Sequence, residues 1–188
     1  KEERKVWVCD SFEGLPQPND AQYPADQGDT HFQAQWLKAS QETVARNFAT
    51  YDLLSDQVRF VKGFFSHTLP LVKNEIEKIS ILRLDGDMYE STIVALENLY
   101  PLLEVNGYVI VDDYGLPNCR KALADYRKFH GIEDEYVGID KSSVYFKKTK
   151  QCDKDKVEHR FALPKPAVSQ APATTYSQPN KGASISSS

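Results

Sequence analysis

Residues 79–91 of the chain read ISILRLDGDMYES, and residues 107–115 read GYVIVDDYG. Each stretch is a short apolar run that ends abruptly in carboxylates. These are Asp85 and Asp87 in the first stretch, and Asp112 and Asp113 in the second. Short β-branched runs bounded by polar residues are typical of buried strands in a parallel sheet. The two stretches therefore predict neighbouring strands of an α/β fold.

The position of the four acids predicts a metal site. In open α/β sheets, ligands bind outside the carboxyl ends of the strands, so we expect the acids to face one crevice. Crowded carboxylates repel one another, which raises their pKa values unless a positive charge lies between them. A hard divalent cation with oxygen ligands is the simplest occupant. The competing interpretation, in which single acids cap the following helices, explains one Asp more readily than the whole set.

Composition limits the class of protein. With 188 residues and 40% apolar residues, the chain supplies the core of one domain, which we place at residues 1–149. A net charge of −4 gives no reason to expect nucleic acid or an anionic membrane as a partner. Cys9, Cys119 and Cys152 are scattered and follow no metal spacing, which favours reduced thiols in the cytoplasm. Neither a membrane span nor a signal peptide is indicated, and residues 150–188 predict a disordered tail.

Hydrophobic spacing and turn residues predict the remaining elements. We expect strands over 6–9, 58–61, 79–84 and 108–111, helices after Ser40, around Leu69, over 92–103 and after Asn118, and a closing hairpin of 136–139 and 143–148. Their order predicts a doubly wound α/β fold. The long segment 11–38, rich in turn formers, predicts a lid over a site. Its aromatic side chains Tyr23 and Trp36 either close over a substrate or simply pack.

Three motifs carry a family resemblance. The stretches DSFEGLP (10–16), LRLDGDMYEST (82–92) and GYVIVDDYG (107–115) occur in the order and spacing of the macrocin O-methyltransferase family. The chain resembles this family over about residues 6–147. The resemblance implies a Rossmann-like class I methyltransferase fold, with S-adenosylmethionine and Mg²⁺ as cofactors. It also implies a sugar-containing small molecule as substrate, and it is compatible with a homo-oligomer.

The resemblance also implies roles for individual residues. Asp85 matches a metal ligand that is also the proposed base, and Asp112 and Asp113 match the paired ligands at the next strand end. The cofactor-binding positions that it implies are Asp10 and Ser11 near the ribose, and Gly63 and Phe64 at the adenine site.

The chain departs from the family pattern in two places. His67 stands where the family usually has an acidic residue, which weakens the match at the adenine site. The first strand and the glycine-rich cofactor loop of the fold, expected before Val6, are not in this sequence. That strand lies between those ending at Asp10 and Asp85, so we expect strands 6–9 and 80–84 to pair directly or another chain to fill the gap. The cofactor loop is lost in both cases, which predicts metal binding with weak or no turnover.

Other interpretations remain open. Asp85-Gly86-Asp87 is also a DxD motif, which nucleotide-sugar glycosyltransferases use to hold a metal and a diphosphate, although three residues are weak evidence. A non-catalytic partial domain is a further alternative. Within the site we favour Asp87 as a helix cap, and His31 and His130 are alternative bases.

Overall fold

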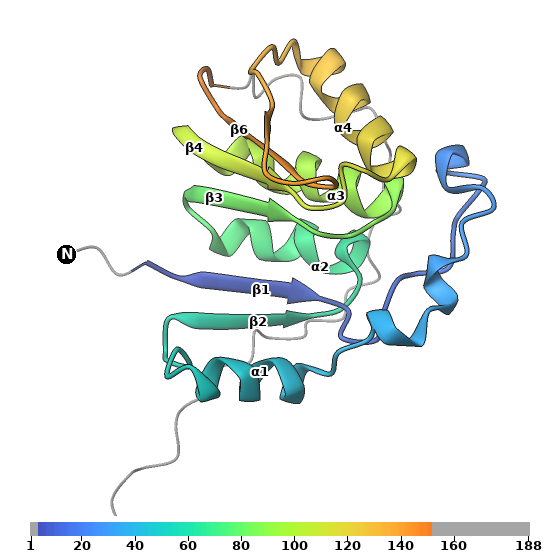
Figure 1. Cartoon of the computed structure of the whole chain (residues 1–188). Coiled ribbons are helices and arrows are strands. Elements are labelled where there is room, and N and C mark those ends of the chain that lie inside the picture. Colours follow the sequence, from blue (N-terminus) through green and yellow to red (C-terminus); the bar gives the residue numbers. More distant parts are fainter. Residues whose placement is uncertain (1–3, 152–188) are drawn as a thin grey trace, which may run out of the picture.

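The computed structural model describes residues 4–151 of the chain (Figure 1). The strands are β1 (Val6–Asp10), β2 (Val58–Lys62), β3 (Ile79–Leu84), β4 (Leu103–Val111), β5 (Val137–Gly138) and β6 (Val144–Lys147). The α-helices are α1 (Gln41–Thr50), α2 (Phe65–Val72), α3 (Tyr89–Leu99) and α4 (Pro117–His130). Short 3-10 helices are η1 (Pro24–Asp26), η2 (His31–Gln33), η3 (Gln35–Leu37), η4 (Lys73–Glu75) and η5 (Tyr100–Leu102). The predicted tail and Cys152 lie outside the described residues, apart from residues 150 and 151.

The strands form two sheets. β1 pairs with β2 in parallel, and a second sheet has the order β3-β4-β6-β5. Within the second sheet β3 and β4 are parallel, whereas β6 is antiparallel to both β4 and β5, which confirms the predicted closing hairpin. The parallel strands end at the same edge, so this topology places Asp10 and Asp85 at one end of the molecule.

Of the two arrangements expected for strands 6–9 and 80–84, direct pairing is wrong. β1 runs beside β3 in Figure 1, but among residues 4–151 no backbone pairing joins the two strands. The two sheets are joined by a shared hydrophobic core. Leu82 and Leu84 of β3 belong to a buried cluster, and Trp7 and Cys9 of β1 pack against it. Side-chain packing therefore holds the two sheets in one domain.

Helices cover the sheets unequally. In Figure 1, α2, α3 and α4 lie behind the four-stranded sheet, and the alternate residues Leu82, Leu84, Val109 and Val111 are buried on that side. α1 packs against the two-stranded sheet on the side away from α2, α3 and α4 (Figure 1). There Ala45 forms a second buried cluster with Val58 and Phe60. Helices thus lie on both sides of the strands, as a doubly wound layout requires.

Several local predictions are confirmed. Ser40 is the N-cap of α1, and its Oγ accepts a hydrogen bond from the Thr43 backbone N–H at 3.2 Å. Gly131 ends α4 in the left-handed conformation at φ +62°, which a residue without Cβ adopts at little cost. The helix around Leu69 is α2, which contains Pro70.

Three boundaries differ from prediction. The helix predicted over 92–103 begins at Tyr89 and ends before Pro101, and Leu103 already belongs to β4. Gly107, expected to lie before the strand, is therefore inside β4, where a Cβ would come within 2.9 Å of two backbone oxygens. Asn118 does not cap α4, because that helix begins at Pro117 with Leu116 as the N-cap.

The predicted lid is partly fixed. Tyr23 is only 2% exposed, and its ring lies 6.2 Å from that of Tyr89 on α3. By contrast, Trp36 on η3 is 80% exposed. The middle of the segment therefore belongs to the core, and its later part faces solvent. No helix in the described part of the chain is long and apolar enough to cross a membrane.

Candidate metal and cofactor site

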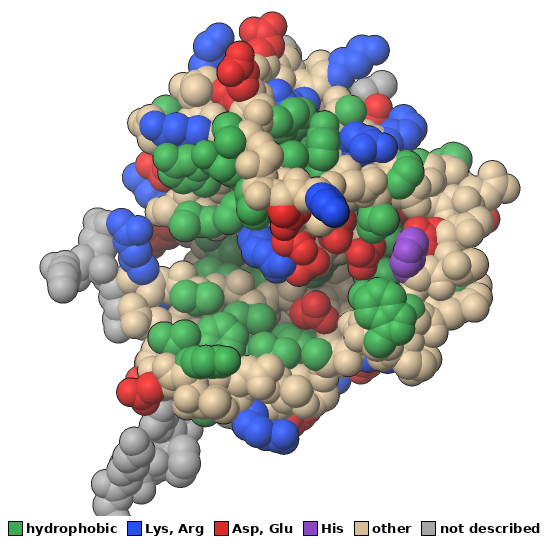
Figure 2. All heavy atoms as spheres, in the orientation of Figure 1, with side chains coloured by type: hydrophobic (Ala, Val, Ile, Leu, Met, Phe, Trp, Pro, Cys, Tyr) green, Lys and Arg blue, Asp and Glu red, His purple; other side chains and the backbone are tan. Residues whose placement is uncertain are grey.

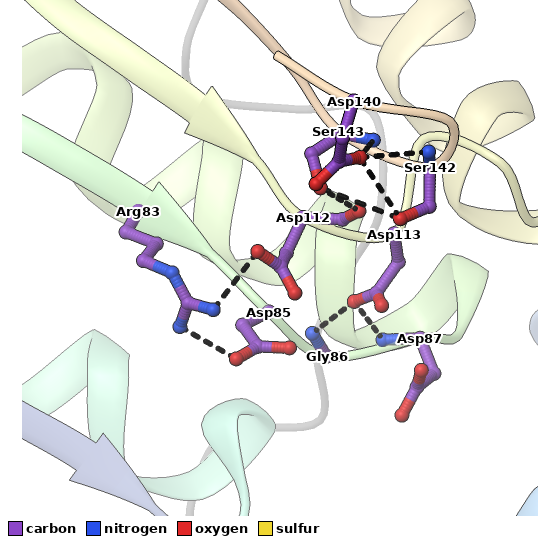
Figure 3. A network of polar contacts seen from close by, with 9 residues as sticks. All are labelled: Arg83, Asp85, Gly86, Asp87, Asp112, Asp113, Asp140, Ser142 and Ser143. Carbon is purple, nitrogen blue, oxygen red and sulfur yellow. Dashed lines mark hydrogen bonds and ion pairs between the residues drawn. The ribbon is translucent and has the colours of Figure 1, made fainter.

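Three of the four predicted acids come together at the ends of β3 and β4 (Figure 3). One oxygen from each of Asp85, Asp112 and Asp113 lies within 4.8 Å of the others. The backbone N–H of Asp112 donates to the Leu84 carbonyl at 2.9 Å, so the pairing of β3 with β4 continues to the carboxylates. This set of hard oxygen donors suits Mg²⁺ or Mn²⁺.

A turn of the closing hairpin supports the end of β4. Ser143 Oγ donates to the Asp112 carbonyl at 3.0 Å. The same turn is closed by Asp140, whose Oδ1 accepts from the backbone N–H groups of Ser142 and Ser143, each at 2.8 Å. The hydrogen-bonded turn at residues 140–143 therefore fixes the backbone that carries Asp112 and Asp113.

Arg83 supplies the positive charge that crowded acids require. Its guanidinium lies 2.5 Å from Asp85 Oδ2 and 2.9 Å from Asp112 Oδ1. Although burial opposes it, the pKa of Arg83 is raised, because both carboxylates favour the charged form. A cation is thus already held between two of the three acids, which fits a site built for positive charge.

Asp87 and Asp113 form a second pair of neighbouring acids. Asp113 Oδ2 accepts from the backbone N–H groups of Gly86 at 3.0 Å and Asp87 at 2.9 Å. Asp87 has φ +56°, a conformation that few residues other than glycine adopt. Burial, followed by the charge of Asp113, raises the pKa of Asp87 to about 7. Burial also raises the pKa of Asp113.

The prediction that Asp87 caps α3 is wrong. The N-cap of α3 is Met88, whose side chain makes no capping hydrogen bond. Instead, the fully buried Asp26 of η1 accepts from the backbone N–H groups of Tyr89 at 2.7 Å and Glu90 at 2.9 Å. A carboxylate from the lid segment therefore satisfies the first free donors of this helix.

A pocket adjoins the acids where β1 and β3 end. It holds about 390 Å³, open solvent included, and its lining includes Asp10, Ser11, Phe64, Asp85 and Glu90. In Figure 2, acidic side chains gather around a hollow on this face. Burial raises the pKa of Asp10, whose Oδ1 accepts from the Phe12 backbone N–H at 2.6 Å.

The remaining predicted cofactor position, Gly63, lies next to this pocket without lining it. Its N–H donates to the Asp10 carbonyl at 2.9 Å, and its φ is +141°. A Cβ there would lie 2.7 Å from Thr68 Cγ2. The alternative base His130 lies near the end of α4, and the centroid of its ring lies 4.3 Å from that of Tyr126.

Sequence reasoning missed Arg83 and Asp26. Arg83 precedes Asp85 by two residues, so strand alternation places both on one side, and this signal was present in the sequence. Asp26 contacts residues more than 60 positions away, and no local pattern predicts such a contact.

Comparisons with known proteins agree with the motifs. The Macrocin-O-methyltransferase (TylF) family model matches residues 1–148. Demethyldecarbamoylnovobiocin O-methyltransferase of Streptomyces niveus is 46% identical over 150 residues, which are 79% of this chain and 56% of that protein. Mycinamicin III 3''-O-methyltransferase of Micromonospora griseorubida is 43% identical, covering 78% of this chain and 58% of that protein.

A solved structure shows the same fold. The O-methyltransferase NovP superposes with a TM-score of 0.74 at 46% identity, covering 79% of this chain and 62% of that one. The predicted α/β fold of the class I methyltransferase type is thereby confirmed. The chain spans little more than half the length of the curated relatives it matches. By its sequence and its fold, the chain belongs to the macrocin-O-methyltransferase (TylF) family.

Proposed function

We propose that this chain carries the metal-binding and cofactor-binding residues of an S-adenosylmethionine- and Mg²⁺-dependent O-methyltransferase. Its substrate is a sugar hydroxyl of a glycosylated small molecule, as the names of its relatives suggest. The observation that carries the proposal is the convergence of three carboxylates within 4.8 Å, beside a pocket lined by Asp10 and Ser11. The free thiols of Cys9 and Cys119 suit the reducing cytoplasm.

The residues of the site have three functions: metal binding, proton acceptance and positioning of the carboxylates. Asp85, Asp112 and Asp113 hold Mg²⁺, which when bound lowers the proton affinity of a hydroxyl group. Asp85, with a half-exposed side chain, accepts the proton of the attacking hydroxyl. Arg83 keeps Asp85 and Asp112 in a fixed relative position.

The pocket residues bind the methyl donor. The Asp10 carboxylate suits the diol of a ribose, with Ser11 beside it, and the aromatic ring of Phe64 and the backbone of Gly63 lie on the adenine side. The sulfonium donor is already activated, so positioning supplies much of the rate.

A glycosyltransferase using Asp85-Gly86-Asp87 has weaker support. Within residues 4–151, the lining of the pocket includes three acids (Asp10, Asp85 and Glu90) and three serines, but no Lys or Arg. The nearby Arg83 is already paired with two carboxylates. A diphosphate therefore lacks the basic side chains that usually bind it.

A methyl-transfer assay tests the proposal. Transfer of a labelled methyl group from S-adenosylmethionine to a 6-deoxyhexose glycoside is expected with Mg²⁺, and it is expected to stop with EDTA or in Asp112→Asn. Glu104→Gln, an exposed acid at the far end of β4, is the control with unchanged activity. Preferential binding of a UDP-sugar over S-adenosylmethionine would favour the glycosyltransferase interpretation instead.

A further inference from the structure

Three hydrogen-bonded residues, Asn118, Asp29 and His31, lie outside the residues proposed to bind the metal and the cofactor. Asn118 Nδ2 on α4 donates to Asp29 Oδ2 at 3.0 Å. The other oxygen, Asp29 Oδ1, accepts from the His31 backbone N–H at 2.7 Å and lies 2.9 Å from His31 Nδ1. The Asp29 side chain is only 6% exposed, whereas that of His31 is 45% exposed. A buried carboxylate therefore fixes an accessible imidazole.

The loop that bears His31 is anchored to two helices. Asp26 binds the first backbone N–H groups of α3, and the Asp29 backbone N–H donates to the Asp26 carbonyl at 3.0 Å. Asn118 attaches the same loop to the first turn of α4. The imidazole is thus presented from a fixed support, although the segment around it lacks long helices.

The loop that bears the ring lies beside the acidic site. Asn118, which binds Asp29, is five residues beyond Asp113, and Tyr89, whose N–H binds Asp26, is two residues beyond Asp87. No hydrogen bond joins His31 to Asp87 within residues 4–151. His31 therefore stands near the Asp87–Asp113 pair without being used by it.

The contact with Asp29 selects one form of the neutral imidazole. When Nδ1 carries the hydrogen and donates to Asp29, Nε2 keeps its lone pair and can only accept. In histidine–carboxylate pairs, the carboxylate fixes both the tautomer and the orientation of the ring. A half-exposed acceptor beside acids that hold a cation suits a polyhydroxylated molecule.

We propose that His31 is a substrate-positioning residue whose Nε2 accepts a hydrogen bond from a hydroxyl group of the acceptor sugar. This inference rests on the proposed function, because it assumes that a sugar occupies the crevice beside Asp85. Asp29 and Asn118 act through His31 by fixing its ring. The competing explanation is that Asp29 only closes a surface turn and that the imidazole has no ligand.

The tautomer of His31 gives a first test that needs no ligand. At pH 8, long-range ¹H–¹⁵N spectra of the wild-type chain are expected to show protonated Nδ1 and unprotonated Nε2 for His31, identified by its absence in His31→Gln. Asp29→Ala is expected to shift the ring toward the Nε2–H form, which free histidine prefers. A wild-type ring already in the Nε2–H form overturns the proposal.

Titration with methyl α-L-rhamnopyranoside in the presence of Mg²⁺ gives the second test. The His31 ring signals are expected to shift, and His31→Gln is expected to bind the sugar about tenfold more weakly. Gln33→Ala, at an exposed position of the same 3-10 helix, is the matched control with unchanged affinity. Unmoved His31 signals, or equal affinity in His31→Gln, overturn the proposal. Methyl transfer, measured on the same samples, decides the proposed function separately.

Discussion

Arg83 is the residue that sets the charge of the candidate metal site. Its guanidinium contacts Asp85 and Asp112, two of the three carboxylates that would hold the ion. A metal ion and the guanidinium therefore compete for the same oxygens. These groups are half exposed, so solvent limits the strength of the ion pairs.

Replacement of Arg83 tests this competition. Arg83→Met is expected to tighten Mn²⁺ binding roughly twofold to fivefold, because the competing positive charge is removed. Calorimetric titration measures the change, and Arg59→Met on β2 is the control. Weaker Mn²⁺ binding in Arg83→Met would contradict this prediction and show that the ordering of the two carboxylates by Arg83 outweighs its competition with the ion.

The Asp87–Asp113 pair predicts a dependence of stability on pH. The pKa of Asp87 rises from 3.8 in the unfolded chain to about 7, first through burial and then through the charge of Asp113. The folded state thus binds more protons, and this group's contribution to stability is lost as the pH rises from about 4 to 7. Urea unfolding of Asp87→Asn is expected to match the wild type near pH 4 and to exceed it at pH 8. A constant difference across that range would contradict the assignment.

At the level of elements, the lid segment and α3 stabilise each other. Asp26 is fully buried and binds two N-terminal N–H groups of α3. Asp26→Ala is expected to lower the free energy of unfolding by about 1–2 kcal/mol, as loss of a helix cap does. Asp20→Ala, at an exposed site of the same segment, controls for the loss of charge. Equal effects of the two substitutions in urea titrations would show that the cap contributes nothing.

The elements also show what sequence can predict. Patterned segments such as β3, β4 and α4 are evident from apolar spacing, and the grouping of Asp85 with Asp112 and Asp113 follows from parallel strands ending at one edge. Contacts between distant segments have no such local signal. Lys148 is an example: at the end of the predicted hairpin it is fully buried, and its Nζ donates to the Leu103 carbonyl at 2.6 Å.

At the scale of the whole molecule, the two sheets leave facing strands incompletely paired. Within residues 4–151, β3 pairs only with β4, whereas β4 pairs with both β3 and β6. Ile81 on β3 is 63% exposed. Tyr108 of β4, opposite Ile81, is 41% exposed on the uncovered face of the sheet. The free edge of β3, which faces β1, could therefore accept the backbone hydrogen bonds of a further strand.

Hydrogen exchange distinguishes an open edge from a closed one. In a parallel strand with one partner, alternate N–H groups point away from that partner. Roughly half of the β3 amides are therefore expected to exchange quickly, while those of residues 108–111 of β4, which have partners on both sides, stay protected. Protection along the whole of β3 would show that this edge is already covered in solution.

Asp85, Asp112 and Asp113 are proposed to hold a divalent cation, and Mn²⁺ titration calorimetry tests this binding most directly. The wild-type chain is expected to bind one ion, and Asp112→Ala is expected to lose most of that affinity because one of three carboxylates is gone. Absence of binding in the wild type, or unchanged binding in Asp112→Ala, would contradict the claim.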